Sequence, residues 1–173
     1  INRWPNHEEN SKYTTTFAVP LQAKLRKAVQ AGVKYGAMEV SSHALSQNRV
    51  AGCDFNGAVF TNLSRDHLDY HDSMESYFDA KASLFRSHLI DDDGPRSVIN
   101  IDDKWGSILA KELNKKCWTC SLKENSQTRE KPDLYISNLQ IMQDGYMGKL
   151  HTPFGVGNFI SPLIGEFNLM NML

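Results

Sequence analysis

The sequence predicts an α/β fold, in which a mostly parallel sheet is flanked by helices and an antiparallel hairpin lies near the C-terminal end. The first observation is that short apolar segments alternate with helical patterns between residues 20 and 121, as is typical of parallel sheets. The second is a change after Pro132, where two β-like segments flank a turn at Asp144 and Gly145. The third is length, because 173 residues without an internal repeat suit a single domain with one core.

The first part of the chain predicts a loop, a helix and two buried strands. Residues 1–16 are polar and irregular and are expected to form a loop. Apolar residues recur at helical spacing from Pro20, and Gly32 ends this helix. Residues 33–40 and 58–63 are mostly apolar, which is typical of buried strands.

The remainder continues this alternation. Asp72 and Glu75 have the spacing of a capping box, which predicts a helix from there to about Leu89. The further expected elements are a turn over 91–95, a strand over 97–101, a helix over 103–114, a strand over 117–121, hairpin strands over 134–142 and 146–151, and a loop over 164–168 that enters a helix cut short by the chain end.

Composition excludes several classes of function. The formal net charge of -1 and the pI near 6.6 give no reason to expect nucleic acid or an anionic membrane surface as a partner. No apolar stretch reaches the roughly 18 residues of a membrane span, and no secretory signal follows Ile1, so a cytoplasmic protein is expected. The pair Cys117 and Cys120 lacks the second ligand pair that a zinc site needs.

Polar and acidic residues follow the first two predicted strands where each strand ends. Glu39 lies near the end of the first strand, and Asn62 ends the second and is soon followed by Asp66 and His67. Because the carboxyl ends of parallel strands face the ligand crevice, these residues would suit a hard divalent metal with one nitrogen ligand. The alternative is a solvated polar loop, with Glu39 as an ordinary surface acid.

Lys81 interrupts the apolar stripe of the helix predicted after Asp72. It lies three residues after Phe78 and four before Phe85, on the face expected to pack. Its long stem could carry the charge out to water. Burial would instead lower the pKa of the amine, which could then react with carbon dioxide to form an anionic carbamate beside the metal.

Three stretches together resemble a known family. Residues 38–50 read MEVSSHALSQNRV, residues 60–71 read FTNLSRDHLDYH, and Lys81 follows Ala80. In this order and spacing they resemble the central domain of the Mur ligases, and among these the UDP-N-acetylmuramoyl-tripeptide synthetases. The resemblance covers the whole chain, and its first residues look most like cyanobacterial members.

This resemblance implies an ATP-dependent ligase that joins meso-diaminopimelate to UDP-N-acetylmuramoyl-L-alanyl-D-glutamate through an acyl phosphate, in peptidoglycan synthesis. ATP is the co-substrate, Mg²⁺ is the cofactor, and the parent enzyme is expected to be monomeric. The resemblance implies that Glu39, His67 and carbamylated Lys81 are the catalytic and metal-binding residues. The remaining implied contacts are those to the muramoyl dipeptide from Thr14, Thr15, Ser41, Gln47 and Arg49, and those to the nucleotide from Asn62, Asn168 and Asn171.

Some features depart from the family pattern. Tyr13 stands where many members have Asn or His, and Thr16 replaces a common Pro. A phosphate-binding Gly-Lys-Thr loop is absent, so the chain is expected to lack it together with the N-terminal UDP-binding and C-terminal amino-acid-binding domains, and to be inactive alone. The alternatives are another Mur ligase, a ligase like folylpolyglutamate synthase, or a non-catalytic binding domain.

Overall fold

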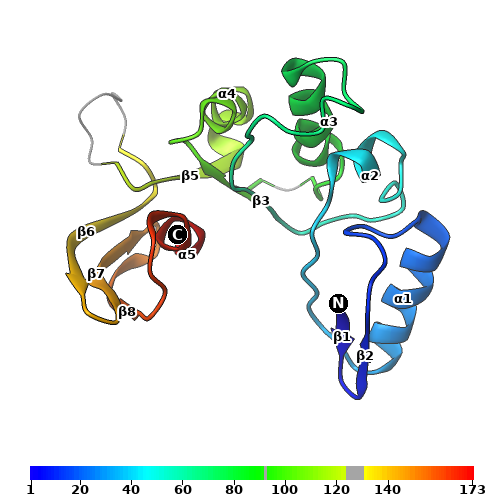
Figure 1. Cartoon of the computed structure of the whole chain (residues 1–173), viewed down its shortest axis with the longest axis horizontal. Helices are drawn as coiled ribbons and strands as arrows, with labels where there is room; N and C mark the ends of the chain where they lie inside the picture. The colour runs from blue at the N-terminus through cyan, green and yellow to red at the C-terminus, as the bar shows by residue number, and fades with distance from the viewer. Residues whose placement is uncertain (92, 124–130) are drawn as a thin grey trace. The chain divides into compact units, whose positions relative to one another are not determined.

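The computed structural model describes residues 1–91, 93–123 and 131–173, so the turn expected over 91–95 lies partly outside the described residues. Contacts within the chain divide it into two compact units (Figure 1). The first unit comprises Ile1–Phe55 and Arg65–Leu89, and the second comprises Asn56–Ser64 and Ile90–Leu173. That they form a single domain stays a prediction. Within the described ranges, no helix is long and apolar enough to cross a membrane.

The first unit begins with a β-hairpin, so the prediction of a loop over residues 1–16 was wrong for this part. β1 (Asn2–Trp4) pairs antiparallel with β2 (His7–Glu9). Asn6 has a φ of 60°, the left-handed conformation that tight turns use and asparagine tolerates. The strands are too short and polar to show an alternating pattern, and cross-strand contacts such as the stacked rings of Trp4 and His7, 4.0 Å apart, stabilise the pair.

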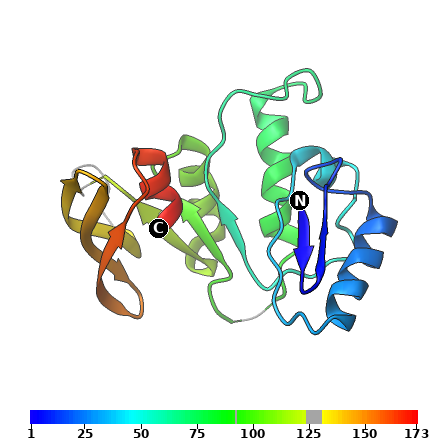
Figure 2. The same ribbon diagram turned by 60° about the horizontal axis from the view of Figure 1, so that its bottom comes forward.

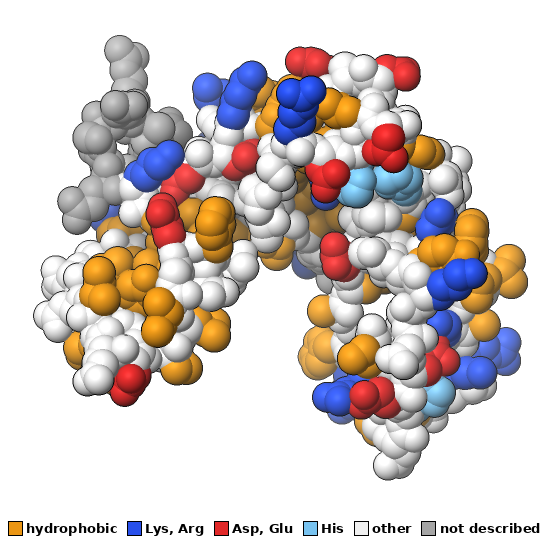
Figure 3. Space-filling model, viewed as in Figure 1, with side chains coloured by type: hydrophobic (Ala, Val, Ile, Leu, Met, Phe, Trp, Pro, Cys, Tyr) orange, Lys and Arg blue, Asp and Glu red, His pale blue; other side chains and the backbone are white. Residues whose placement is uncertain are grey.

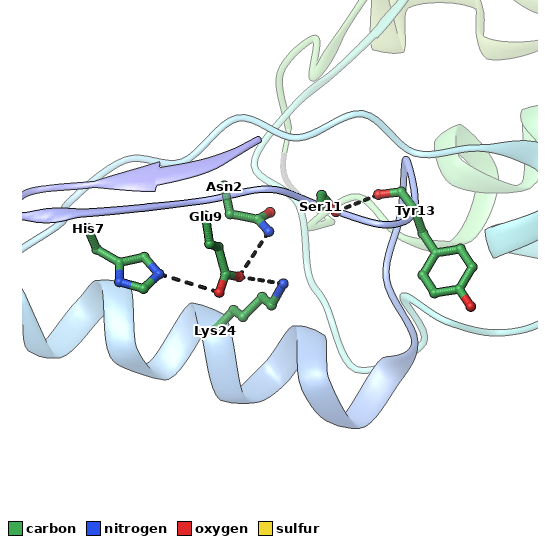
Figure 4. Close-up of polar contacts among 6 residues, drawn as sticks. All are labelled: Asn2, His7, Glu9, Ser11, Tyr13 and Lys24. Atoms are coloured by element: carbon green, nitrogen blue, oxygen red, sulfur yellow. Dashed lines mark hydrogen bonds and ion pairs between the residues drawn. The ribbon is translucent and has the colours of Figure 1, made fainter.

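The hairpin lies along α1 (Ala18–Gln30), which confirms the first predicted helix (Figure 2). Glu9 links the two elements, because its carboxylate accepts a hydrogen bond from Asn2 and pairs with Lys24 Nζ at 2.6 Å (Figure 4). The bond from Lys24 lowers the pKa of Glu9. As predicted, Gly32 follows the helix, with a φ of 85° that favours glycine. One buried apolar cluster of this unit consists of Leu21, Leu45, Val50 and Cys53.

Residues 33–40 do not form the predicted strand. They run without regular structure between α1 and α2 (Ser42–Ser46), and the side chain of Tyr35 is 92% exposed. A strand exists only through hydrogen bonds to a neighbour, and none of the described strands pairs with this segment. The apolar composition of this segment therefore predicted a strand that does not form.

The second predicted helix is α3 (Met74–Ser87), and its first residue differs by one from the capping-box prediction. Ser73, rather than Asp72, is the N-cap, and Ser76, rather than Glu75, completes the box. The backbone of Ser73 is extended, and its hydroxyl accepts from Ser76 N at 3.1 Å. The choice of cap thus follows the backbone conformation and not the side-chain charge.

The second unit contains a six-stranded sheet in the order β3-β4-β5-β6-β7-β8, which confirms the predicted α/β class. Neighbours are parallel from β3 to β6 and antiparallel from β6 to β8. The strands are β3 (Ala58–Phe60), β4 (Ser97–Asn100), β5 (Cys117–Ser121), β6 (Leu134–Met142), β7 (Gly145–Thr152) and β8 (Gly155–Ser161). The sequence analysis missed β8, whose two glycines and asparagine give little β propensity.

Helices α4 (Lys104–Leu113) and α5 (Glu166–Met172) and the short 3₁₀ helix η1 (Asn114–Lys116) complete this unit. Asp103 caps α4 by accepting bonds from two backbone amides of its first turn. Gly106 brings α4 against the end of β4, because a Cβ there would lie 2.0 Å from the carbonyl oxygen of Asn100. Ile99 and Leu109 are fully buried in the resulting core.

Candidate functional site

The predicted site residues are divided between the two units. The first unit holds Glu39, His67 and Lys81 together with Thr14, Thr15, Ser41, Gln47 and Arg49. The second unit holds Asn62, Asn168 and Asn171.

Thr15 joins two segments that are distant in sequence. Its side chain is only 1% exposed, and its hydroxyl donates to the carbonyl of Glu39 at 2.9 Å and accepts from the amide of Ser41 at 3.0 Å. The same Ser41 caps α2 through its own hydroxyl, which accepts from Ala44 N. The loop before α1 therefore positions the chain on both sides of Val40. By contrast, Thr14 is exposed.

Arg49 is the centre of a second set of bonds. Its Nη1 donates to the carbonyl of Thr15 at 2.8 Å, while Nε and Nη2 both donate to Oε1 of Gln47, at 2.9 and 2.6 Å. Gln47 in turn donates to the hydroxyl of Tyr70 at 3.3 Å. Four of the five residues predicted to contact the dipeptide, Thr15, Ser41, Gln47 and Arg49, thus form one bonded group. A guanidinium fixed in this way is suited to recognise an oxyanion.

Lys81 lies on α3, whose buried face is formed by Tyr77, Phe78, Ala82 and Phe85. The lysine itself is half-buried, and this burial lowers the pKa of its amine, while the nearby charge of Glu39 acts in the opposite direction. Its ammonium nitrogen lies 5.5 Å from the centre of the Tyr77 ring. A neutral amine is therefore easier to form here than on an exposed lysine.

His67 borders the same aromatic ring. Its imidazole centroid is 5.6 Å from that of Tyr77, in an edge-on arrangement. The backbone of His67 has a φ of 55°, which is uncommon for a residue other than glycine and is held by bonds from the amides of Tyr70 and His71 to its carbonyl. The Tyr77 ring is thus 5.6 Å from the His67 ring and 5.5 Å from the Lys81 amine, and Glu39 is close enough to affect the charge of that amine.

A cluster of histidine and tyrosine rings lies around Tyr77, and the sequence analysis assigned no role to most of its members. The rings of His43 and His67 lie 5.0 Å apart, those of His43 and Tyr70 4.0 Å, and those of His71 and Tyr77 5.1 Å. Figure 3 shows histidine side chains gathered on one face near α2. The signal was present in the sequence, because His67, Tyr70 and His71 span a single turn of chain.

His71 is the buried member of this cluster. Its Nε2 lies 2.9 Å from the hydroxyl of Ser42, and both side chains are buried. Burial lowers the pKa of His71, and the neighbouring charges of His43 and His67 lower it further, whereas Asp72 and Asp69 oppose the shift. A neutral imidazole here ties α2 to the chain before α3.

A metal site that includes a lysine carbamate would differ from one built only from unmodified His, Cys, Asp or Glu side chains. Across the described residues, no three His, Cys, Asp or Glu side chains are arranged to hold a metal ion. Glu39 and His67 supply only two groups of these types. That Glu39, His67 and Lys81 bind a metal ion therefore stays a prediction.

The predicted nucleotide-binding residues lie in the second unit. Asn62 is exposed just after β3, and the loop that carries it is held by bonds from Asn100 Nδ2 to the Thr61 carbonyl (2.7 Å) and from Leu63 N to Asp103 (3.2 Å). The other two, Asn168 and Asn171, are exposed on α5. No hydrogen bond among the described residues joins Asn62 to either of them.

These features point to one family. A family model described as the Mur ligase middle domain matches residues 2–173. The chain belongs to the Mur ligase middle-domain family. This family assignment agrees with the resemblance noted in the sequence, whereas the roles of the individual site residues stay predictions.

Relatives within the family carry more specific names. The UDP-N-acetylmuramoyl-L-alanyl-D-glutamate--2,6-diaminopimelate ligase of Prochlorococcus marinus (strain NATL1A) is 96% identical over 173 residues, which are 100% of this chain and 34% of that protein. The ligase of the same name from Synechococcus sp. (strain WH7803) is 53% identical over 173 residues, again covering 100% of this chain and 34% of that protein. The chain thus spans about a third of the length of the curated relatives it matches.

Solved structures support the same assignment. A structure of a UDP-N-acetylmuramoyl-L-alanyl-D-glutamate--2,6-diaminopimelate ligase has a TM-score of 0.77 and 38% identity, covering 92% of this chain and 32% of that chain. A MurF structure from Acinetobacter baumannii has a TM-score of 0.53 and 18% identity, covering 67% of this chain and 23% of that chain, which is a likeness of fold alone.

Proposed function

We propose that this chain forms the middle domain of an ATP-dependent ligase that joins meso-diaminopimelate to UDP-N-acetylmuramoyl-L-alanyl-D-glutamate in peptidoglycan synthesis. The observation that carries the proposal is the half-buried amine of Lys81, whose pKa is lowered by burial, on the same aromatic ring as His67 and near the charge of Glu39. The names of the relatives support the choice of substrates. A cytoplasmic location is part of the proposal, because ATP and the UDP-linked substrate must both reach the site.

Lys81 is proposed to act as a carbamate. The lone pair of its neutral Nζ attacks the carbon of CO₂, an N–C bond forms, one C=O π bond becomes a carboxylate-like oxygen anion, and a proton leaves the nitrogen for solvent. The lowered pKa favours the neutral amine that this step requires. The product carries a negative charge where an ammonium would repel a divalent cation.

Magnesium is the metal that these residues fit. Glu39 would supply carboxylate oxygens, His67 an imidazole nitrogen and a Lys81 carbamate a further pair of oxygens, a set that would suit a hard cation that tolerates one nitrogen ligand. When bound, Mg²⁺ would neutralise part of the negative charge on the transferring phosphoryl group. The left-handed backbone of His67 is strain of the kind found where a side chain must be aimed.

The remaining predicted residues are proposed to serve two substrates, the muramoyl dipeptide and ATP. Arg49, supported by Gln47, is proposed to bind an oxyanion of the muramoyl dipeptide. The hydroxyl of Thr15 already bonds to Glu39 and Ser41, so we propose that it positions these neighbours instead of donating to substrate. Asn62, Asn168 and Asn171 are proposed to contact ATP, whose terminal phosphate would form an acyl phosphate that the amine of diaminopimelate attacks.

A full-length hybrid enzyme tests this function. These 173 residues replace the matching segment of the Prochlorococcus marinus (strain NATL1A) relative, and ligation of diaminopimelate to UDP-N-acetylmuramoyl-L-alanyl-D-glutamate is followed together with ADP release. We expect magnesium-dependent ligation that falls by at least about a hundredfold in K81A and is partly restored by a small added carboxylate, which can occupy the place of the carbamate.

The matched control is K115A, because Lys115 is an exposed lysine in η1. It should ligate at the unsubstituted rate. Ligation by the K81A hybrid at the rate of the K115A hybrid would rule out the proposed role of Lys81. A hybrid that releases ADP with another acceptor, but not with the muramoyl dipeptide, would rule out the proposed substrate.

A further inference from the structure

Two aromatic side chains, Tyr13 and Phe17, surround the guanidinium of Arg49. The centre of the Phe17 ring is 4.3 Å from Arg49 Cζ, and that of Tyr13 is 5.8 Å away. The two rings meet edge to face, with centroids 5.3 Å apart and an interplanar angle of 82°. We call Tyr13 and Phe17 the aromatic pair. A cation within about 6 Å of a ring centre is attracted to its face, and Phe17 is well inside this range.

The position of Phe17 is unfavourable for the helix that it starts. Phe17 is the N-cap of α1 and makes no side-chain capping bond. Helices usually begin with Ser, Thr, Asp or Asn, whose side chains accept from the free amides of the first turn. The ring is also 48% exposed, so burial of apolar surface only partly explains why this residue is a phenylalanine. Neither local helix stability nor core packing accounts for a phenylalanine here.

The protein leaves some donors of Arg49 free. A guanidinium has five N–H groups. Nε, Nη1 and Nη2 each donate once to Gln47 or Thr15, so one N–H on each terminal nitrogen has no protein partner within the described part of the chain. These two donors can serve an oxyanion.

From this geometry we infer that Phe17, braced by Tyr13, is a positioning residue that stacks on Arg49 and aims its two free donors at an oxyanion of the muramoyl substrate. The inference rests on the proposed function and extends it to residues outside the predicted site. Tyr13 then has a role in this chain as the brace. Ser11 supports the brace by donating its hydroxyl to the carbonyl of Tyr13 at 2.6 Å (Figure 4).

The oxyanion is either the pyrophosphate of the UDP group or a carboxylate of the dipeptide, since both accept from a guanidinium. Two ligands separate these sources. UDP-N-acetylglucosamine contains the pyrophosphate without a carboxylate, and the complete muramoyl dipeptide contains both. If a substitution of Phe17 weakens the binding of both ligands by the same factor, the oxyanion is the pyrophosphate. If it weakens only the binding of the muramoyl dipeptide, the oxyanion is the carboxylate.

F17S in the hybrid enzyme is the informative variant, because serine can cap α1 while it removes the ring. We expect KM for the muramoyl dipeptide to rise by about two- to fivefold, the factor that corresponds to an exposed cation–π contact. KM for ATP, kcat and the unfolding midpoint should stay near their original values. F17W should restore KM, since the indole ring binds cations best.

A double-mutant cycle with R49K completes the test. If Phe17 acts through Arg49, F17S should change KM much less in the R49K background than in the original one. An equal change in both backgrounds, an unchanged KM in F17S, or a fall in unfolding midpoint that accompanies the KM change would overturn the inference while leaving the proposed function intact. Failure of the unsubstituted hybrid to bind the muramoyl dipeptide would overturn both.

Discussion

Thr15→Val should release the segment before α2 while keeping the shape of the side chain. Valine is nearly isosteric with threonine but has no hydroxyl, so the Glu39 carbonyl loses its donor and the Ser41 amide loses its acceptor. A buried group left without a partner costs roughly 1–3 kcal/mol. Because Glu39 is exposed and Ser41 is half-buried, we take the lower end for each and expect a total of about 2 kcal/mol.

Thr15→Ser is the matched control. It keeps the hydroxyl and removes one methyl group from a side chain that is 1% exposed, which should cost about 1 kcal/mol. If only the burial of apolar surface mattered, Thr15→Val would be more stable than the unsubstituted chain and Thr15→Ser would be less stable. The lost hydrogen bonds predict the opposite order, with the valine variant less stable than the serine variant.

Hydrogen exchange at the Ser41 amide is the direct assay, because the hydroxyl of Thr15 is its acceptor. A loss of about 2 kcal/mol corresponds to roughly thirtyfold faster exchange in Thr15→Val. The amide of Ile99, in the core of the second unit, should exchange at its original rate and serves as the internal reference. Equal exchange of Ser41 in the valine and serine variants would refute the reasoning.

Three further outcomes are expected. In CO₂-free buffer at neutral pH, Lys81→Met should raise the unfolding midpoint, because burial lowers the pKa of Lys81 and a half-buried ammonium destabilises the folded state. This gain should shrink as the pH rises from the lowered pKa of the folded state towards the pKa of the unfolded state. Above the latter the amine is neutral in both states, so this gain disappears. Burial raises the pKa of Cys117 and of Cys120 to about 11, so both stay protonated at pH 8 and should react with a disulfide reagent at least about tenfold more slowly in the folded chain than in denaturant. Gly106→Ala should destabilise the second unit by about 1–3 kcal/mol, measured by chemical denaturation, because the new Cβ would lie 2.0 Å from a carbonyl oxygen of β4.

Each of these outcomes has a control or a result that would contradict it. Lys115→Met, at an exposed lysine, should show no such pH-dependent gain, and a gain of Lys81→Met over the unsubstituted chain that is absent at neutral pH, or is larger at high pH than at neutral pH, would contradict the first expectation. Native-state labelling as fast as in denaturant would contradict the second. Gly157→Ala places its Cβ in open space, so equal losses in the two glycine variants would contradict the third.

The parts of the fold that the sequence predicted correctly are those with a strong local signal. The helix around Leu21 has apolar residues at helical spacing and a glycine just after its end. The strands over 97–101, 117–121 and 134–142 have continuous β-forming runs, and the turn at Gly145 separates two of the antiparallel strands. In these segments the backbone preference of most residues agrees with the final structure.

The errors occurred where pairing, and not preference, decides the structure. Residues 33–40 look like a strand but have no partner among the described strands, whereas β1 and β8 look unlike strands and are paired residue by residue with a neighbour. The cap of α3 moved by one residue because Ser73 has the extended backbone that a cap needs.

The candidate site shows the same division. The motifs around Glu39, His67 and Lys81 indicated the family and nominated the residues. They could not indicate that the hydroxyl of Thr15 is already used by two backbone groups, or that His71 is buried against Ser42.

By itself the sequence determined the family, the α/β class and which residue types stand at the candidate site, because these follow from local preference, motif order and spacing. Only the tertiary structure decided which of those side chains are buried, which donors are already in use and how Tyr13 and Phe17 are arranged around Arg49. The physical reason is that burial and hydrogen bonding depend on neighbours that are distant along the chain, and a residue's own identity does not specify them.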